Sequence, residues 1–510
     1  MLDYLSDLRT DKAHDNWTLE IMSLCTLSTP VQSRFVVLVT TVDTLVRLPL
    51  LESDLGQPLL YINLINHVLR SPHNLIGLSI MDVLLGLIAQ TLRVLQLPLT
   101  PSPKPTPPRV TRENLLYALK CCIAGLPTHI YYTDQVTDML SALMIRLKPD
   151  TDSPTRDRNG YFSTSISRQV ALEFVCDVLK VANATRSTES RNPVPIAIWE
   201  GSQWLLSDPS LSVRRTYTEA LITWLELETT KTDFQFTHPE PPLRSADTKL
   251  ARRAASNDRQ ETNKRQTFLQ LLHLANYENA LQFAVSSPED IINLHALLST
   301  LTKHLGVNAV VSGLPMIFTL QEEIARIESP VGKLQIGSLV HGYLWALVDI
   351  FSCEHEVAGK AILDEVGRRQ GREIWVREIE YPPPKVSIRR TFSLSTIGEE
   401  VVGQEDLKPF DDRESLVDSV LRHCESSDGL KEKMMETWSQ EECIQDATAP
   451  ESASVSAFAL ALAAAADRQM ASPRSEGSVS KGSSSQPAKP LPQVGDLKKK
   501  LAMGVLATLF

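Results

Sequence analysis

The chain has 510 residues, of which 43% are hydrophobic and 21 are glycine, and its formal net charge is −10. An acidic chain lacks the excess of Lys and Arg that general nucleic-acid binding requires, so we expect no nucleic-acid partner. The scarcity of glycine disfavours a turn-rich all-β fold. The seven cysteines include no Cys-x-x-Cys pair, which argues against zinc and favours reduced thiols in a reducing compartment.

Helical periodicity begins in the N-terminal region. Ile62, Ile65 and Leu69 recur at positions i, i+3 and i+7, which places them on one face of a helix. The apolar stripe widens over Leu78–Leu95, which indicates a helix packed on two sides. We therefore predict an all-α fold, an ARM/HEAT-like helical-repeat solenoid, whose N-terminal repeats occupy 1–97.

A proline-rich stretch follows the first repeats. Residues 98–109 read PLTPSPKPTPPR, and proline both lacks an amide donor and restricts the residue before it. This composition predicts a linker. Further HEAT-like repeats are expected over 110–228.

The turn at 207–210, Ser-Asp-Pro-Ser, separates two apolar segments. Pro209 prevents the first segment from continuing, and Asp208 or Ser210 can cap the helix that follows. An Asp-Pro turn followed by Val-Arg is typical of the join between the two helices of a HEAT repeat. We predict that Asp208 and Arg214 link neighbouring repeats, with Arg214 reaching a turn carboxylate of the next repeat. A surface turn of an ordinary helical bundle is the alternative.

The second half of the chain alternates between helical and polar segments. Residues 229–263 are charged and poor in apolar side chains, which predicts a mobile loop. Helical periodicity returns over 264–381. Residues 382–410 begin PPPK and become rich in Ser and Thr, which predicts a linker. Within it, Ser393 lies three residues after Arg390 and is a candidate phosphorylation site, where a phosphate would add negative charge.

A short helical island is predicted over 411–445, split in two by a Ser-Ser-Asp-Gly break. Short helices are marginal alone in water and gain stability from packing against a partner. We therefore predict that 382–445 docks partly in trans on a helical-repeat partner and that phosphorylation near Ser393 weakens its contact with an acidic surface. The alternative is that the island folds back on its own repeats. The candidate docking side chains are Leu416, Val420, Leu430, Met434 and Trp438.

Residues 446–510 are dominated by Ser, Ala and Pro and predict a mostly disordered C-terminal tail. Near its end, Lys498, Lys499 and Lys500 precede an apolar stretch. At about 1 kcal/mol per basic residue, they would supply weak assistance to binding an anionic membrane. A terminal helix docked on the repeats is an equal alternative.

No catalytic constellation is apparent. The histidines of the predicted helices lack metal-ligand spacing, and Cys353 and His355 cannot face each other on a helix. Glycine-rich phosphate loops, metalloprotease motifs and nucleophile elbows are absent from the sequence. We expect no catalytic residues, no cofactor and no metal site.

Five sequence blocks carry a family resemblance. They are similar to the fungal branch of the eighty-five-requiring family, whose animal relative is called rolling blackout. The resemblance implies a non-catalytic scaffold of helical repeats on the cytosolic face of the plasma membrane. It also implies recruitment of a phosphatidylinositol 4-kinase complex through a helical-repeat adaptor. The blocks are Asn74–Ile88, Leu205–Leu225, Leu305–Leu320, Gln335–Trp345 and Ala361–Glu380.

Membrane attachment is the point at which the sequence departs from this pattern. Relatives attach through N-terminal acylated cysteines, basic residues or both, whereas MLDYLSDLRTDKAHDNW has no cysteine cluster, no Met-Gly myristoylation start and no polybasic run. The sequence shows no secretory signal and no apolar stretch of about 18 residues. We expect a segment upstream of Met1 to contact plasma-membrane lipids. If the protein instead begins at Met1, we expect a cytoplasmic location. The alternative function is a soluble helical-repeat adaptor in trafficking or transport.

Overall fold

The computed structural model describes residues 12–51, 54–97, 110–149, 160–185, 192–235, 249–384, 407–422 and 429–448. The chain divides into two compact units, Met1–Ala459 and Leu460–Phe510, and every described residue belongs to the first. In these residues the structure is helical apart from turns and one isolated bridge between Leu147 and Phe162. The all-α prediction is confirmed.

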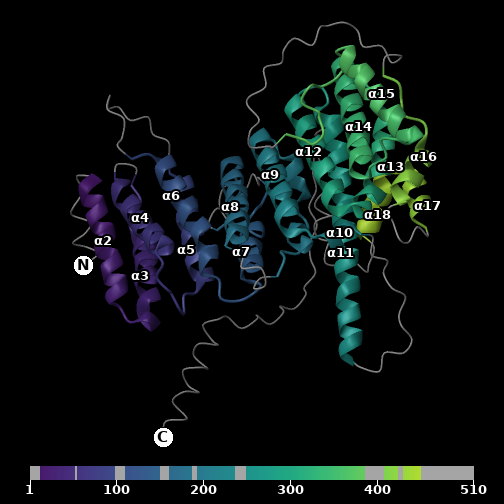
Figure 1. Cartoon of the computed structure of the whole chain (residues 1–510). Coiled ribbons are helices and arrows are strands. Elements are labelled where there is room, and N and C mark those ends of the chain that lie inside the picture. Colours follow the sequence, from purple (N-terminus) through teal and green to yellow (C-terminus); the bar gives the residue numbers. More distant parts are fainter. Residues whose placement is uncertain are drawn as a thin grey trace, which may run out of the picture. The chain divides into compact units, whose positions relative to one another are not determined.

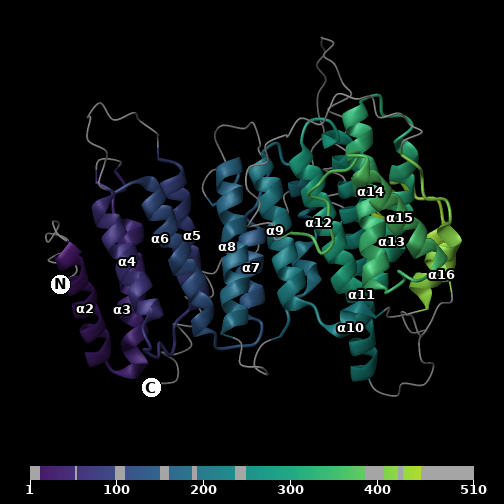
Figure 2. The same ribbon diagram turned by 45° about the horizontal axis from the view of Figure 1, so that its top comes forward.

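The helices of this unit form two layers that follow the chain (Figures 1 and 2). In each layer, successive helices contact one another, and the second-layer elements from α3 to α13 pack on neighbouring helices of the first. This paired stacking is the architecture of a helical-repeat solenoid. The first layer comprises α2 (Lys12–Ser28), α4 (Gly56–Arg70), α6 (Arg112–Gly125), α8 (Ser165–Ala184), α9 (Leu211–Glu228), α12 (Pro288–Leu305), α14 (Pro330–Ile350) and α15 (Val357–Gly371).

The second layer is built from the helices and 3-10 turns that alternate with these. It comprises α3 (Arg34–Arg47), α5 (Ile80–Leu95), α7 (Gln135–Met144), the 3-10 turns η3 (Ile196–Trp199) and η4 (Gln203–Ser207), α11 (Lys249–Phe283), α13 (Val307–Glu323) and α17 (Leu430–Met435). The remaining elements are η1 (Val31–Ser33), η2 (Leu126–His129), α10 (Lys231–Phe234), α16 (Arg413–Leu421) and α18 (Gln440–Thr448).

Local sequence explains where several helices begin. Thr111 and Asn114 form a capping box at the start of α6, and Thr164 and Ser167 form another at α8. Gly306 joins α12 to α13 with a φ of 53°, where an added Cβ would lie 2.5 Å from the carbonyl oxygen of Phe234. Glycine is therefore required at this tight join by both backbone conformation and space.

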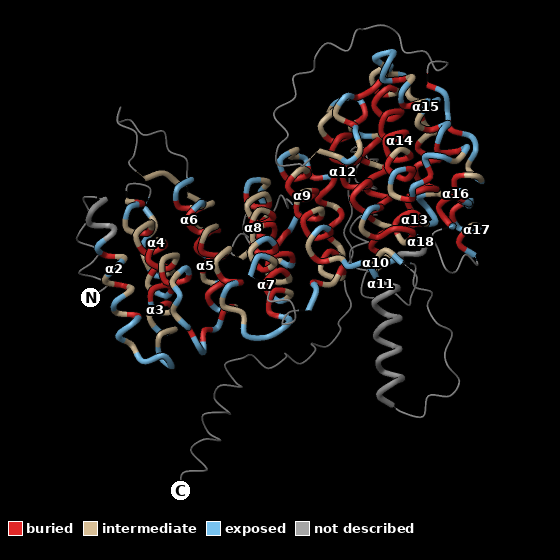
Figure 3. Tube along the Cα trace, viewed as in Figure 1, coloured by how far each residue is buried: buried red, intermediate tan, exposed pale blue. Residues whose placement is uncertain are grey.

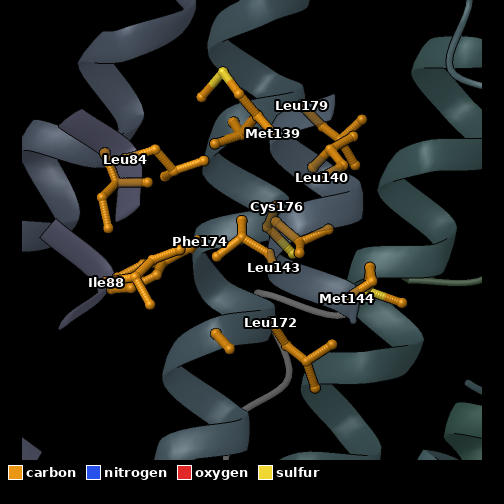
Figure 4. Close-up of a cluster of buried hydrophobic side chains, with 14 of the residues drawn as sticks. Leu84, Ile88, Met139, Leu140, Leu143, Met144, Leu172, Phe174, Cys176 and Leu179 are labelled. Atoms are coloured by element: carbon orange, nitrogen blue, oxygen red, sulfur yellow. The ribbon is translucent and has the colours of Figure 1, made fainter. Parts of the chain in front are cut away.

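The core lies between the two layers, where Figure 3 shows the buried residues. One hydrophobic cluster runs from Met22 in α2 to Ala309 in α13, and a second runs from Tyr277 in α11 to Met434 in α17. Figure 4 shows part of the first cluster, where Leu84 and Ile88 of α5 approach Phe174 of α8. Burial of these faces holds adjacent repeats together, because no single helix pair can bury both of its faces alone.

Two segments differ from the sequence-based expectation. The loop predicted over 229–263 contains α10 and the first fifteen residues of the 35-residue helix α11, with 236–248 outside the described residues. Residues 249–263 lack Gly and Pro and are rich in Ala and Arg, so helix propensity outweighs their polarity. Conversely, the apolar segment before the 207–210 turn, expected to be the first helix of a HEAT pair, forms η3 and η4, because Pro195 and Gly201 interrupt it.

Candidate interaction site

Two buried ion pairs link consecutive helices of the first layer. Arg168 of α8 lies 2.7 Å from the carboxylate of Asp208, and both side chains are at most 1% exposed. The other carboxylate oxygen of Asp208 accepts a hydrogen bond from the backbone N–H of Ser210, at 2.9 Å. Asp208 therefore shapes the turn before α9 and ties that turn to α8, whereas the Ser210 side chain makes no capping bond.

Arg214 of α9 extends this connection to α12. Its guanidinium donates to both carboxylate oxygens of Asp290, at 2.8 and 2.6 Å, and the carbonyl oxygen of Asp208 accepts from it at 2.6 Å. It also stacks on Phe283, with 4.1 Å between the guanidinium carbon and the ring centroid. The sequence predicts a turn carboxylate of the next repeat as the partner of Arg214, and Asp290 occupies the first turn of α12. Together, Arg168, Asp208, Arg214 and Asp290 form what we call the ion-pair ladder.

The candidate docking side chains of the helical island lie in the core. Leu416 and Val420 have no exposed surface, and Leu430 and Met434 are at most 2% exposed. Trp438 is partly buried, with its ring centroid 4.7 Å from that of Tyr277. Because these side chains pack on their own chain, they are not available to a partner in this arrangement. The trans-docking hypothesis for these five residues is thus replaced by the folded-back alternative.

Polar contacts hold the island and the preceding residues against α13, α14 and α15. Arg369 donates to the carbonyl oxygens of Gly337 and Lys408, at 2.9 and 2.8 Å. The amide side chain of Gln321 bonds both the N–H and the carbonyl oxygen of Phe410, at 2.9 and 3.1 Å. Residues 407–410, at the end of the predicted linker 382–410, therefore pack against the helical repeats. Of this linker, 385–406 lie outside the described residues.

A cavity of about 840 Å³ lies where the two hydrophobic clusters meet. We call it the junction cavity. Its walls come from the segment before η3, the end of α9, and helices α10, α11, α13, α17 and α18. Its apolar lining includes Trp224, Leu269 and Trp438, and its rim carries the exposed Glu436 and Glu442. The sequence does not reveal the junction cavity, because its lining residues are spread over about 250 positions, from 193 to 443.

Two buried histidines among the described residues have lowered pKa values. Burial lowers the pKa of His273 to about 4, and burial with the nearby Arg369 lowers that of His341 to about 3. Cys353 is buried whereas the His355 side chain is 90% exposed, so the two do not pair. Within the described ranges, no group of three or more His, Cys, Asp or Glu side chains is arranged to hold a metal ion. Ser393, Lys498, Lys499 and Lys500 lie outside the described residues.

Known proteins resemble the chain over most of its length. A family profile described as EFR3 protein matches residues 16–185, which run from α2 to α8. The chain is 37% identical to Protein EFR3 of Pyricularia oryzae over 79% of its own length and to that of Gibberella zeae over 81%. EFR3 proteins are therefore what this chain resembles over about four fifths of its own length. A more distant EFR3 protein, from Yarrowia lipolytica, is 23% identical over 42% of the chain.

The matched EFR3 proteins are longer than this chain. The match covers 39% of the Pyricularia oryzae protein and 42% of the Gibberella zeae protein, so the chain spans about two fifths of their length. No solved structure matches the chain. In the part that the structure describes, no helix combines the length and apolar character needed to cross a membrane.

Proposed function

We propose that the chain is a non-catalytic scaffold that recruits a phosphatidylinositol 4-kinase complex to the cytosolic face of the plasma membrane. A helical-repeat adaptor makes the contact with the kinase. The similarity to EFR3 proteins, together with the two-layer helical stack, carries this proposal. The ion-pair ladder and the two hydrophobic clusters support it, because they hold neighbouring repeats together in the fixed arrangement that a platform requires.

Recruitment can be tested without knowing how the chain attaches to a membrane. The chain is tethered by a terminal histidine tag to neutral phosphatidylcholine vesicles that carry a nickel-chelating lipid. Purified kinase complex is added with or without its helical-repeat adaptor, and the vesicles are floated on a density gradient. We expect the kinase to float only when both chain and adaptor are present. Kinase that stays at the bottom with both present contradicts recruitment and favours a soluble adaptor in trafficking or transport.

A second proposal concerns Ser393, in the segment between the helical repeats and the island. Phosphorylation there adds close to two negative charges and would weaken contact with an acidic partner surface. In the flotation assay, Ser393→Glu should reduce kinase recruitment relative to Ser393→Ala. Equal recruitment by the two variants would remove Ser393 from the mechanism.

The C-terminal lysines are proposed as a weak membrane contact. Three basic residues at about 1 kcal/mol each supply roughly 3 kcal/mol near an anionic surface. The triple variant Lys498→Gln, Lys499→Gln and Lys500→Gln should therefore bind untethered phosphatidylserine vesicles more weakly than the native chain. Binding that does not change with this variant or with salt would assign membrane attachment elsewhere.

A further inference from the structure

We propose that the junction cavity binds a basic peptide segment of a partner protein, with an Arg or Lys side chain inserted between its carboxylates and indole rings. This inference is separate from kinase recruitment, since it rests on the cavity alone. At about 840 Å³ the cavity lies in the size range of specific ligand sites, which is roughly 300–1,000 Å³. Such a volume accommodates several consecutive side chains of a peptide.

The charges on the cavity lining favour a positively charged ligand. Four carboxylates, those of Glu228, Asp233, Glu436 and Glu442, face two cationic side chains, Arg265 and Lys433. Asp233 is engaged with Arg265 at 3.0 Å, and Glu228 accepts a hydrogen bond from the N–H of Val194 at 3.0 Å. In the described part of the chain, Glu436 and Glu442 form no ion pair. The negative charge at the rim therefore attracts a cationic segment and repels acidic or phosphorylated ones.

The aromatic lining fits the same ligand. Trp438 lies between α17 and α18, with its ring against Tyr277, and the largely buried Trp224 of α9 also lines the cavity. An indole face attracts a guanidinium or ammonium group, and the aliphatic stem of Arg or Lys packs on the same apolar surface. Leu269 and Val311 supply further apolar contact for a neighbouring side chain of the peptide.

Polar groups in the cavity suit a peptide backbone. The Gln266 side chain lines the cavity and carries an amide N–H that can donate to a peptide carbonyl. Asn308 also lines the cavity, with its amide nitrogen donating to the carbonyl oxygens of Asp233 and Gln235, both at 3.0 Å. The cavity thus combines a site for a cation with a hydrogen-bond donor for a main-chain oxygen. A free amine or a metal ion has no carbonyl group and would not use this donor.

The test uses the full chain and a fluorescein-labelled peptide, ARRLRAA, followed by fluorescence polarisation. The control peptide is AEELEAA, in which glutamates replace the arginines. We expect saturable binding of the basic peptide alone. The double variant Glu436→Gln/Glu442→Gln should weaken binding by roughly tenfold or more. A second variant, Ser312→Phe, fills the cavity from α13 and should abolish binding.

A matched control separates the cavity from general electrostatics. The double variant Glu354→Gln/Glu380→Gln removes the same charge from exposed positions outside the cavity and should bind like the native chain. Equal loss in both double variants, equal binding of the acidic peptide, or no binding at millimolar peptide would overturn the proposal. If Ser312→Phe lowers the melting temperature, the two double variants alone decide the outcome. Because no kinase is present, failure here leaves the scaffold proposal unaffected.

Discussion

The ion-pair ladder joins α8, α9 and α12 through side chains that are almost completely removed from water. Charges in such a position are costly unless each has its partner, so the ladder favours one relative arrangement of the three helices. Exposed pairs elsewhere differ in kind. Arg326 and Glu323, for example, pair on the surface, where the Arg326 side chain is 78% exposed.

Removing one member of the ladder should therefore be severe. Arg214→Ala leaves the Asp290 carboxylate buried without its partner, and we expect the free energy of unfolding to fall by about 3–5 kcal/mol. Arg326→Ala is the matched control and should change it by no more than about 0.5 kcal/mol. Urea unfolding followed by circular dichroism measures both. Similar small losses in the two variants would show that Arg214 is solvated.

The buried histidines make stability depend on pH. Folding lowers the pKa of His273 to about 4 and that of His341 to about 3, from an ordinary value of 6.5. Below about pH 6.5 the unfolded chain binds protons that the folded chain does not, so stability present at neutral pH is lost as the pH falls toward 4. Each histidine contributes up to about 1.4 kcal/mol per pH unit.

Thermal melts between pH 7.5 and 4.5 check this expectation. The melting temperature should fall with decreasing pH, and the decrease should be smaller in the double variant His273→Gln/His341→Gln. An identical pH profile for the native chain and the variant would mean that carboxylates, rather than these histidines, control the acid response.

At the scale of elements, α16 and α17 complete the C-terminal end of the stack. Leu416 and Val420 of α16 fill the second hydrophobic cluster, and the Arg422 guanidinium at the end of α16 lies 2.5 Å from Glu356, just before α15. Lys431 of α17 in turn pairs with Glu414 and Asp418 of α16, at 3.0 and 2.8 Å. A chain truncated before 407 would therefore expose core, so a truncation cannot distinguish loss of a docking segment from loss of folding.

A point substitution tests the role of α16 more cleanly. Leu416→Ala removes a side chain with no exposed surface, and we expect a loss of about 2–5 kcal/mol in the free energy of unfolding. Met435→Ala, at a position that is 38% exposed, should cost far less and serves as the control in the same urea titration. A small effect of Leu416→Ala would indicate that α16 detaches readily, and it would favour the hypothesis that the helical island docks on a partner.

At the scale of the whole described unit, stability should be greatest where both layers cover a helix. Most residues of α12 and α14 are buried, whereas α2 has neighbours on one side and α18 is largely exposed. Local opening is easier for elements with few buried contacts. Hydrogen exchange should therefore be slowest in α12 and α14 and fastest in α2 and α18. Uniform protection across the stack would contradict this gradient.

Local sequence determined the helices and the repeat architecture of this protein. The 3.6-residue spacing of apolar side chains and the Asp208–Pro209 turn are short-range signals, and they sufficed to predict an all-α stack with Arg214 directed at the next repeat. In contrast, the low hydrophobicity of 249–263 wrongly predicted a loop. These residues are helical because the segment contains no helix-breaking Gly or Pro.

Only the tertiary structure decided which surfaces were already occupied. The same apolar spacing in α16 and α17 serves equally well for a partner or for the chain's own core, and packing on α13 and α15 settled the choice. Likewise, Asp290 lies 76 residues after Arg214, and the junction cavity collects residues from 193 to 443. Contacts at such separations depend on how the repeats stack, which no local pattern encodes.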